Sequence, residues 1–88
     1  MSPAPATAGL KVLFFGHLPQ LTGCPETPWP LPDPPTVAAL LESLYQHWPA
    51  LRAAGSSLRV AVNLEYSGRS ALIPAGAEVA IMPPVQGG

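Results

Sequence analysis

The stretch "TVAALLESLYQHW", residues 36–48, decides the fold class of this 88-residue chain. Its apolar residues recur at intervals of three and four, which places them along one side of a helix of about three turns. They are Val37, Leu40, Leu41, Leu44 and Trp48. Thr36 stands where an N-cap belongs, and Pro49 disfavours continuation past Trp48. We therefore expect one amphipathic helix whose apolar side packs against a larger element.

Stretches rich in β-forming residues flank this helix. "LKVLFF" (10–15), "LRVAVNLEY" (58–66) and "EVAIM" (78–82) predict three strong strands, and "SALIP" (70–74) predicts a short strand or bridge. A brief edge strand is expected around 26–31, because the closely spaced prolines there cannot donate to a sheet ladder. Together these elements predict an α+β fold, with a mixed sheet of about five strands and one main helix packed on one face.

Alternation along the strands predicts an apolar patch on the side of the sheet away from the helix. If the other apolar residues of the last strand face the helix, Ala80 and Met82 face the opposite side, beside Leu13 and Phe15 of a neighbouring strand. An apolar patch on an open sheet face is typical of a protein-binding surface. We therefore expect these four residues to contact a partner, with Phe15 and Met82 as anchors.

Composition narrows the class of protein. Hydrophobic residues make up 48% of the chain and charged residues 10%, and the formal net charge is −1. The four basic residues are scattered, so neither nucleic acid nor anionic lipid is an expected ligand. No apolar run approaches the roughly 20 residues of a membrane span, and the first residues lack the pattern of a signal peptide. We expect a soluble, cytoplasmic protein.

The chemistry-bearing side chains form no recognisable active site. Cys24 is the single cysteine, so it cannot form an internal disulfide, and no basic residue lies near it in sequence to activate its thiol. His17 and His47 lack a second ligand at metal-binding spacing, and the glutamates show no paired-acid pattern. We expect no bound metal or cofactor, and a chain that is not an enzyme by itself.

The two ends of the chain differ from its middle. Residues 1–9 are small, Pro-rich and uncharged, which predicts a flexible tail ahead of a domain at 10–82. Residues 83–88, "PPVQGG", predict an extended tail that reaches about 20 Å at about 3.3 Å per residue. The absence of Cβ atoms at its end lets the tail pass a narrow channel and present the carboxylate of Gly88. The residues expected to thread into a partner's active site are Pro83, Pro84, Val85, Gln86 and Gly87.

Several of these stretches together resemble a known family. "AVNLEY", the "G-x-E-V-A" pattern at 76–80 and the terminal "PPVQGG" look like the small, sulfur-carrier subunit of molybdopterin synthase. "KVLFFG" and the Thr-capped helix follow the same order, so the resemblance covers residues 10–88. It implies a ubiquitin-like β-grasp fold. One departure is Ala77, where the family commonly has an acidic residue.

The resemblance also implies a function. Gly88 would be adenylated by an adenylyltransferase resembling ubiquitin-activating enzymes, and a sulfur donor protein would convert it to a thiocarboxylate. The tail would then enter the large, catalytic synthase subunit and give sulfur to cyclic pyranopterin monophosphate, within a heterotetramer of two small and two large subunits. The adenylate and thiocarboxylate are covalent states of Gly88, not bound cofactors.

Other classes of protein stay open at this point. A carrier of the same fold could serve thiazole synthesis or tRNA thiolation, or the chain could be a ubiquitin-like modifier that is joined to other proteins by isopeptide bonds. A further alternative is a β-grasp binding module that carries no sulfur and whose tail is inert. Conversion of Gly88 to a thiocarboxylate separates the carriers from that binding module.

Overall fold

The computed structural model describes residues 9–84, apart from the side chain of Ser56. The elements in chain order are β1 (Gly9–Phe14), α1 (Leu18–Thr22), β2 (Glu26–Pro30), α2 (Val37–His47), the 3-10 helix η1 (Pro49–Ser57), β3 (Arg59–Val62), β4 (Glu65–Tyr66) and β5 (Glu78–Met82). The first strand begins one residue earlier than the sequence predicts, and the proline-rich edge strand is present as β2.

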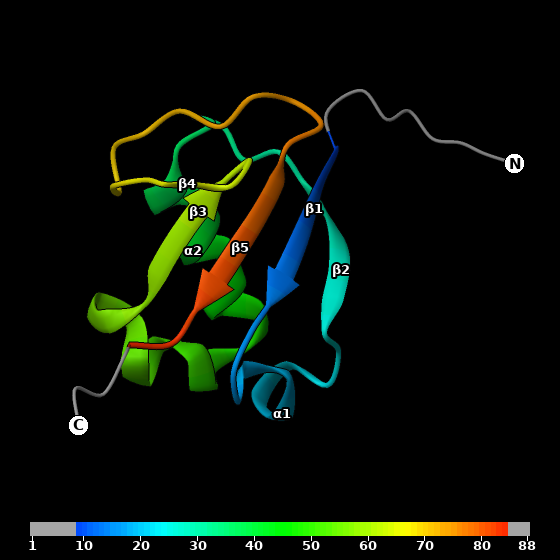
Figure 1. Cartoon of the computed structure of the whole chain (residues 1–88), viewed down its shortest axis with the longest axis vertical. Helices are drawn as coiled ribbons and strands as arrows, with labels where there is room; N and C mark the ends of the chain where they lie inside the picture. Colours follow the sequence, from blue (N-terminus) through cyan, green and yellow to red (C-terminus); the bar gives the residue numbers. More distant parts are fainter. Residues whose placement is uncertain (1–8, 85–88) are drawn as a thin grey trace, which may run out of the picture.

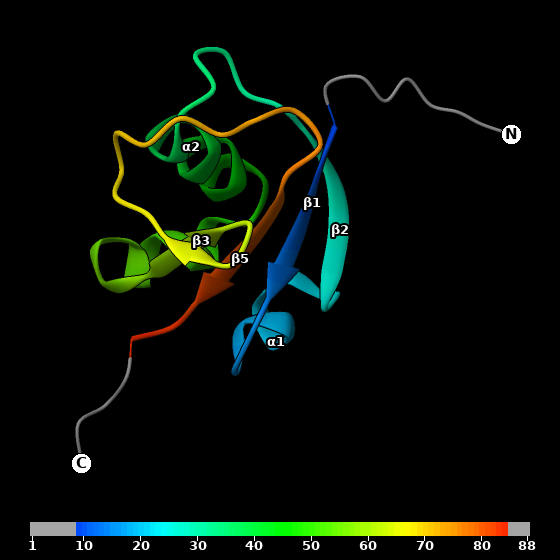
Figure 2. The ribbon, with the colours of Figure 1, turned by 45° about the horizontal axis from the view of Figure 1, so that its top comes forward.

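The strands form one mixed sheet in the order β2-β1-β5-β3-β4 (Figure 1). The central strands β1 and β5 run parallel, and the other three pairs are antiparallel. Helix α2 lies across one face of the sheet, which Figure 2 shows from a second direction. The predicted α+β fold, with a mixed sheet of five strands and one main helix on one face, is confirmed. We call the face opposite α2 the outer face.

Helix α2 has the start and the buried side that the sequence predicts. The Thr36 hydroxyl accepts a hydrogen bond from the backbone N–H of Ala39 at 3.2 Å, which satisfies one of the free donors of the first turn. The helix buries Val37, Leu40, Leu41, Leu44 and Tyr45. Trp48, the C-cap, is half-buried and packs edge-on against the ring of Phe14 with the ring centroids 5.5 Å apart.

The buried side of α2 meets alternate residues of the central strands. In β5, Val79 and Ile81 are fully buried, while Ala80 and Met82 are half-buried on the outer face. In β1 the same alternation buries Leu10, Val12 and Phe14. The period of two along each strand thus separates a core facing α2 from a second row of side chains on the outer face.

The sequence predicts a single strand at 58–66, but the structure has a hairpin of β3 and β4 there. Val62 pairs with Glu65, so Asn63 and Leu64 form a two-residue turn with φ values of 50° and 73°. Both residues are in the left-handed region, as a type I′ turn requires. Leu64, which continues the apolar alternation of the sequence, is therefore 90% exposed at the tip of the turn.

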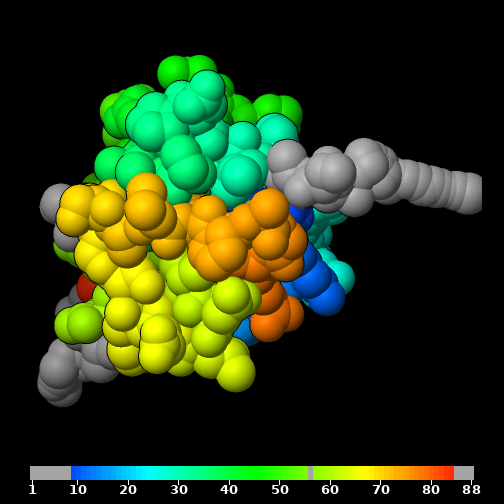
Figure 3. Space-filling model, turned by 90° about the horizontal axis from the view of Figure 1, so that it is seen from above, coloured from blue at the N-terminus to red at the C-terminus, as the bar shows by residue number. Residues whose placement is uncertain are grey.

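Two short helices are present that the sequence does not predict. They are α1 at 18–22 and η1 at 49–57. "SALIP", predicted as a short strand or bridge, forms an isolated bridge between Leu72 and Thr36. This bridge belongs to the long connection from β4 to β5, which crosses between the start of α2 and the β3–β4 hairpin (Figure 3). Backbone bonds from Val37 to Ala71 and from Ile73 to Pro35 hold it there.

No helix within residues 9–84 is long and apolar enough to cross a membrane.

Candidate functional site

The predicted patch of four residues lies together on the outer face, and we call it the docking patch after the role that the sequence predicts for it. Leu13 of β1 pairs with Ala80 of β5, and both are half-buried. Met82 lies two residues further along β5 and is also half-buried. Phe15 extends the ladder beyond β1, because its N–H donates to the carbonyl of Ile81 at 3.0 Å, and 46% of the residue is exposed. The predicted juxtaposition of these side chains is therefore present.

The structure also places Tyr66 on this face, although the sequence does not predict Tyr66 as part of the patch. Strand β4 places Tyr66 opposite Ala61, and Ala61 in turn lies opposite Ala80. Tyr66 is 73% exposed. Its position depends on the Asn63–Leu64 turn, so a reading of 58–66 as a single strand could not find it. The outer face therefore carries two large exposed aromatic side chains, Phe15 and Tyr66.

The C-terminal tail starts next to the docking patch, because Met82 is the last residue of β5 and Pro83 follows it. Pro83 and Pro84 are half-buried, and we call this pair the tail root. Gly16 has a φ of +61°, and a Cβ atom placed on it would lie 2.6 Å from Cγ of Pro83. The absence of a side chain at Gly16 thus lets the Pro83 ring pack directly on the backbone. The other predicted tail residues, Val85 to Gly88, lie outside the described residues.

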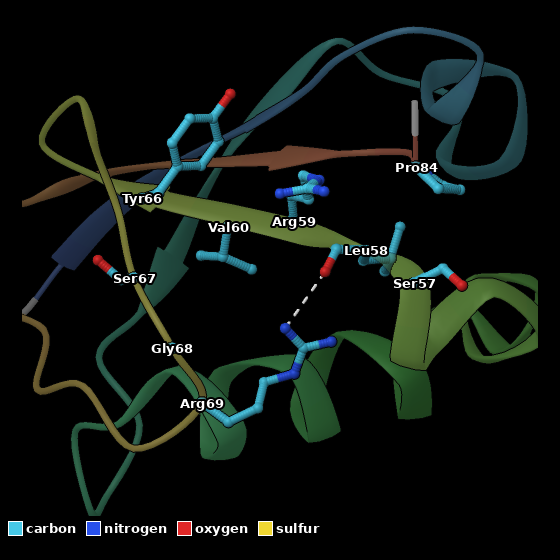
Figure 4. A pocket seen from close by; sticks show the side chains of 9 residues that line it. All are labelled: Ser57, Leu58, Arg59, Val60, Tyr66, Ser67, Gly68, Arg69 and Pro84. Carbon is cyan, nitrogen blue, oxygen red and sulfur yellow. Dashed lines mark hydrogen bonds between the residues drawn. The ribbon is translucent and has the colours of Figure 1, made fainter. Parts of the chain in front are cut away.

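A pocket of about 600 Å³ lies beside the tail root, at the edge of β3 beyond the end of β4 (Figure 4). Its lining residues are Ser57, Leu58, Arg59, Val60, Tyr66, Ser67, Gly68, Arg69 and Pro84. Arg69 is fixed by two hydrogen bonds, because its guanidinium donates to the carbonyls of Gly55 at 2.7 Å and Leu58 at 3.2 Å. Figure 4 shows Arg59 and Tyr66 on the other side of β3 from Arg69.

The cysteine and the two histidines belong neither to the docking patch nor to the lining of the pocket, and they lie at or next to helix ends. Cys24 is half-buried after α1, where Thr22 donates a hydrogen bond to its carbonyl at 2.8 Å. His17 is the N-cap residue of α1, and His47 packs edge-on against Trp48 with the ring centroids 4.5 Å apart. Within residues 9–84, no three His, Cys, Asp or Glu side chains lie close enough to hold a metal ion.

A five-strand mixed sheet on one helix, with a parallel central pair and a tail that starts at the end of β5, defines a ubiquitin-like β-grasp protein. The model of the ThiS family matches residues 12–88, and the chain belongs to this family. The chain is 35% identical over 79 residues to the molybdopterin synthase sulfur carrier subunit of Arabidopsis thaliana, with 90% of this chain and 82% of the relative covered. It is 31% identical over 81 residues to the protein of the same name from Caenorhabditis elegans, covering 90% and 96%.

Solved structures support the same fold. A Pyrococcus furiosus protein, described as a candidate molybdopterin converting factor, subunit 1, superposes with a TM-score of 0.79 at 24% identity, covering 90% of this chain and 100% of its own. The small archaeal modifier protein 1 from Methanosarcina acetivorans superposes with a TM-score of 0.76 at 27% identity, covering 93% and 98%. The β-grasp fold that the sequence resemblance implies is therefore confirmed.

Proposed function

We propose that the chain is a sulfur carrier for molybdopterin synthesis, which acts through the carboxylate of Gly88 as a subunit and co-substrate. The observation that carries the proposal is membership of the ThiS family, together with similarity to two molybdopterin synthase sulfur carrier subunits. The geometry supports it as well, because the tail root lies directly after β5 and beside the docking patch. A protein that binds the outer face is thereby positioned to receive the tail.

The chemistry follows from the poor reactivity of a carboxylate. An oxygen of the Gly88 carboxylate attacks the α-phosphorus of ATP and displaces pyrophosphate, which gives an acyl adenylate with AMP as a good leaving group. Hydrosulfide delivered by a sulfur donor protein then attacks the acyl carbon and displaces AMP with loss of a proton, and the product is a thiocarboxylate whose sulfur is a nucleophile. An adenylyltransferase related to ubiquitin-activating enzymes performs the first step. The chain itself contributes the reacting terminus and the surfaces that position it.

The receiving protein in this proposal is the large, catalytic subunit of molybdopterin synthase. There the thiocarboxylate gives its sulfur to cyclic pyranopterin monophosphate, and two carriers on a dimeric large subunit make a heterotetramer. The docking patch, with Phe15 and Met82 as anchors and Tyr66 beside them, supplies the apolar contact. Burial of such exposed aromatic and thioether side chains is a typical source of binding free energy at protein interfaces.

Removal of Gly88 tests this proposal. The truncated chain keeps residues 9–84, so we expect the same thermal unfolding transition as the full chain but no adenylate when it is incubated with ATP and the adenylyltransferase. Intact-mass measurement of the full chain from cells should show a gain of about 16 Da, since a thiocarboxylate replaces one oxygen by sulfur. Normal adenylation of the truncated chain would refute the proposal.

A second function in the same fold is a ubiquitin-like modifier, favoured by the 27% identity to the small archaeal modifier protein 1. A modifier forms an isopeptide bond between Gly88 and a lysine of another protein. Mass spectrometry of cell extracts distinguishes the two functions, because a modifier leaves covalent adducts of higher mass, whereas a carrier is recovered as free chain with an acid or thioacid terminus. Sulfur transfer to the pterin precursor with the purified large subunit supports the carrier.

A further inference from the structure

The pocket beside the tail root contains a cation that the fold does not use. The chain has four basic residues, and three of them have partners. Lys11 lies 3.7 Å from a carboxylate oxygen of Glu26, Arg52 lies 3.4 Å from one of Glu42, and Arg69 donates to two backbone carbonyls. Arg59 is exposed. Among residues 9–84, its guanidinium has neither an ion pair nor a hydrogen bond.

The residues that line the pocket with Arg59 include no negative side chain. Arg69 also lines the pocket, but its guanidinium lies on the other side of β3 from Arg59 and donates to the carbonyls of Gly55 and Leu58 (Figure 4). The hydroxyl groups of Ser57 and Tyr66 belong to lining residues and can donate hydrogen bonds, whereas the Ser67 hydroxyl already donates to the carbonyl of Glu65 at 2.9 Å. Arg59 is therefore the basic side chain of this pocket that is available, among the described residues, to bind an anion.

The position of the pocket decides which anion it accepts. Pro84, the second residue of the tail root, forms part of the pocket wall, and Arg59 lies opposite Met82 of the docking patch in the β3–β5 register. A protein that binds the docking patch and encloses the tail must therefore cover Arg59. Burial of an unpaired guanidinium is strongly unfavourable, so the covering surface has to supply a negative charge.

We infer that the pocket receives a carboxylate of an aspartate or glutamate side chain from the large synthase subunit, and that Arg59 is its main contact. This inference rests on the proposed function, because it takes that subunit as the protein that encloses the tail. A guanidinium presents parallel N–H donors that match the two oxygens of a carboxylate. Such a pair fixes the direction in which the partner approaches, whereas the apolar docking patch alone supplies adhesion without direction. Arg59 is thus a specificity-determining residue for the protein that accepts the tail.

The test is the dissociation constant of the complex with the purified large subunit, measured by calorimetry for the wild type, Arg59→Gln, Arg59→Glu and Arg52→Gln. Arg52 is the matched control, since it is an exposed arginine whose only ion pair is with Glu42 among the described residues. We expect Arg59→Gln to raise the dissociation constant about tenfold or more, and Arg59→Glu to raise it further. Arg52→Gln should stay within about twofold of the wild type, as expected for an exposed charge remote from an interface.

Salt dependence gives a second readout that a packing role for Arg59 would not change. Added NaCl should weaken binding of the wild type, and the same salt should weaken Arg59→Gln much less, because the screened charge pair is already gone. The thermal unfolding temperature of Arg59→Gln should equal that of the wild type, since the side chain has no partner within residues 9–84. Equal affinity and equal salt dependence for Arg59→Gln and Arg52→Gln would overturn the inference.

Two further outcomes separate this inference from the proposed function. If the wild type fails to bind the large subunit and Gly88 is not converted to a thiocarboxylate, the proposed function fails as well. If the wild type binds and transfers sulfur while Arg59→Gln behaves identically, only the role of Arg59 is lost. Sodium sulfate is the small-anion probe. Shifts of the Arg59 guanidinium resonances on sulfate addition, with unchanged affinity of Arg59→Gln for the subunit, would show a pocket for free anions only and would also overturn the inference.

Discussion

Replacement of Gly16 with alanine tests how the fold holds the tail root. Gly16 has a φ of +61°, and a new Cβ atom would lie 2.6 Å from Cγ and 3.1 Å from Cδ of Pro83. A left-handed backbone costs an L-residue about 1–2 kcal/mol, and the steric overlap adds about 1–3 kcal/mol because a proline ring cannot rotate away from its own backbone. We therefore expect Gly16→Ala to lower the free energy of unfolding by about 2–5 kcal/mol.

Gly23→Ala is the matched control for the backbone term. Gly23 has a φ of +82° at the end of α1, but a Cβ atom there would meet nothing within 4 Å. Gly23→Ala should therefore lower the free energy of unfolding only by the cost of the left-handed backbone, about 1–2 kcal/mol. Urea denaturation of both variants, with equal slopes, measures the difference. We expect Gly16→Ala to be less stable by about 1 kcal/mol or more, and to transfer sulfur more slowly because Pro83 is displaced. Equal stability and equal transfer for the two variants would refute this account of the tail root.

Three further predictions concern the outer face, the hairpin and the cysteine. Phe15→Asp and Met82→Asp should each weaken binding to the large subunit about tenfold or more. Leu72→Asp, at an exposed leucine away from the outer face, should leave the affinity unchanged. Unchanged affinity for both outer-face variants would argue against this docking surface. Leu64→Gly should raise the stability by about 0.5–1 kcal/mol in thermal unfolding, because relief of about 1–2 kcal/mol of left-handed strain at φ 73° exceeds the entropy cost of a glycine of about 0.5–1 kcal/mol. A loss of stability would contradict a strained turn. Cys24→Ser should leave the rate of sulfur transfer unchanged, and a large loss would assign the thiol a chemical role.

Periodicity predicted the elements whose two sides differ in burial. Helix α2 was predicted to its last turn because its apolar spacing, the Thr36 cap and Pro49 all indicate the same limits. The faces of β1 and β5 followed for the same reason. The alternation of apolar and polar residues, however, does not indicate where the chain turns back. Leu64 falls on an apolar position of the pattern, yet the chain turns at Asn63 and exposes it.

The parts of the candidate site that the sequence did not predict depend on strand register. Arg59 lies beside the tail root only because β3 pairs with β5 so that Arg59 is opposite Met82. Tyr66 joins the outer face only because a two-residue turn brings it opposite Ala61. Neither relation has a local signal, since each joins residues that are separated in the chain and paired through the backbone.

Strand β5 connects the docking patch, the pocket beside the tail root and the start of the tail. Met82 contributes to the patch, lies opposite Arg59 and is followed directly by Pro83. Contacts with the outer face therefore position the tail root without a flexible joint, because Pro83 packs on Gly16 and Pro84 borders the pocket. Once the face is bound, entry of the tail is an intramolecular step with a high effective concentration. Under the proposed function, recognition of the carrier would thus depend on the folded domain, and the tail would need only the length and small residues that the sequence predicts.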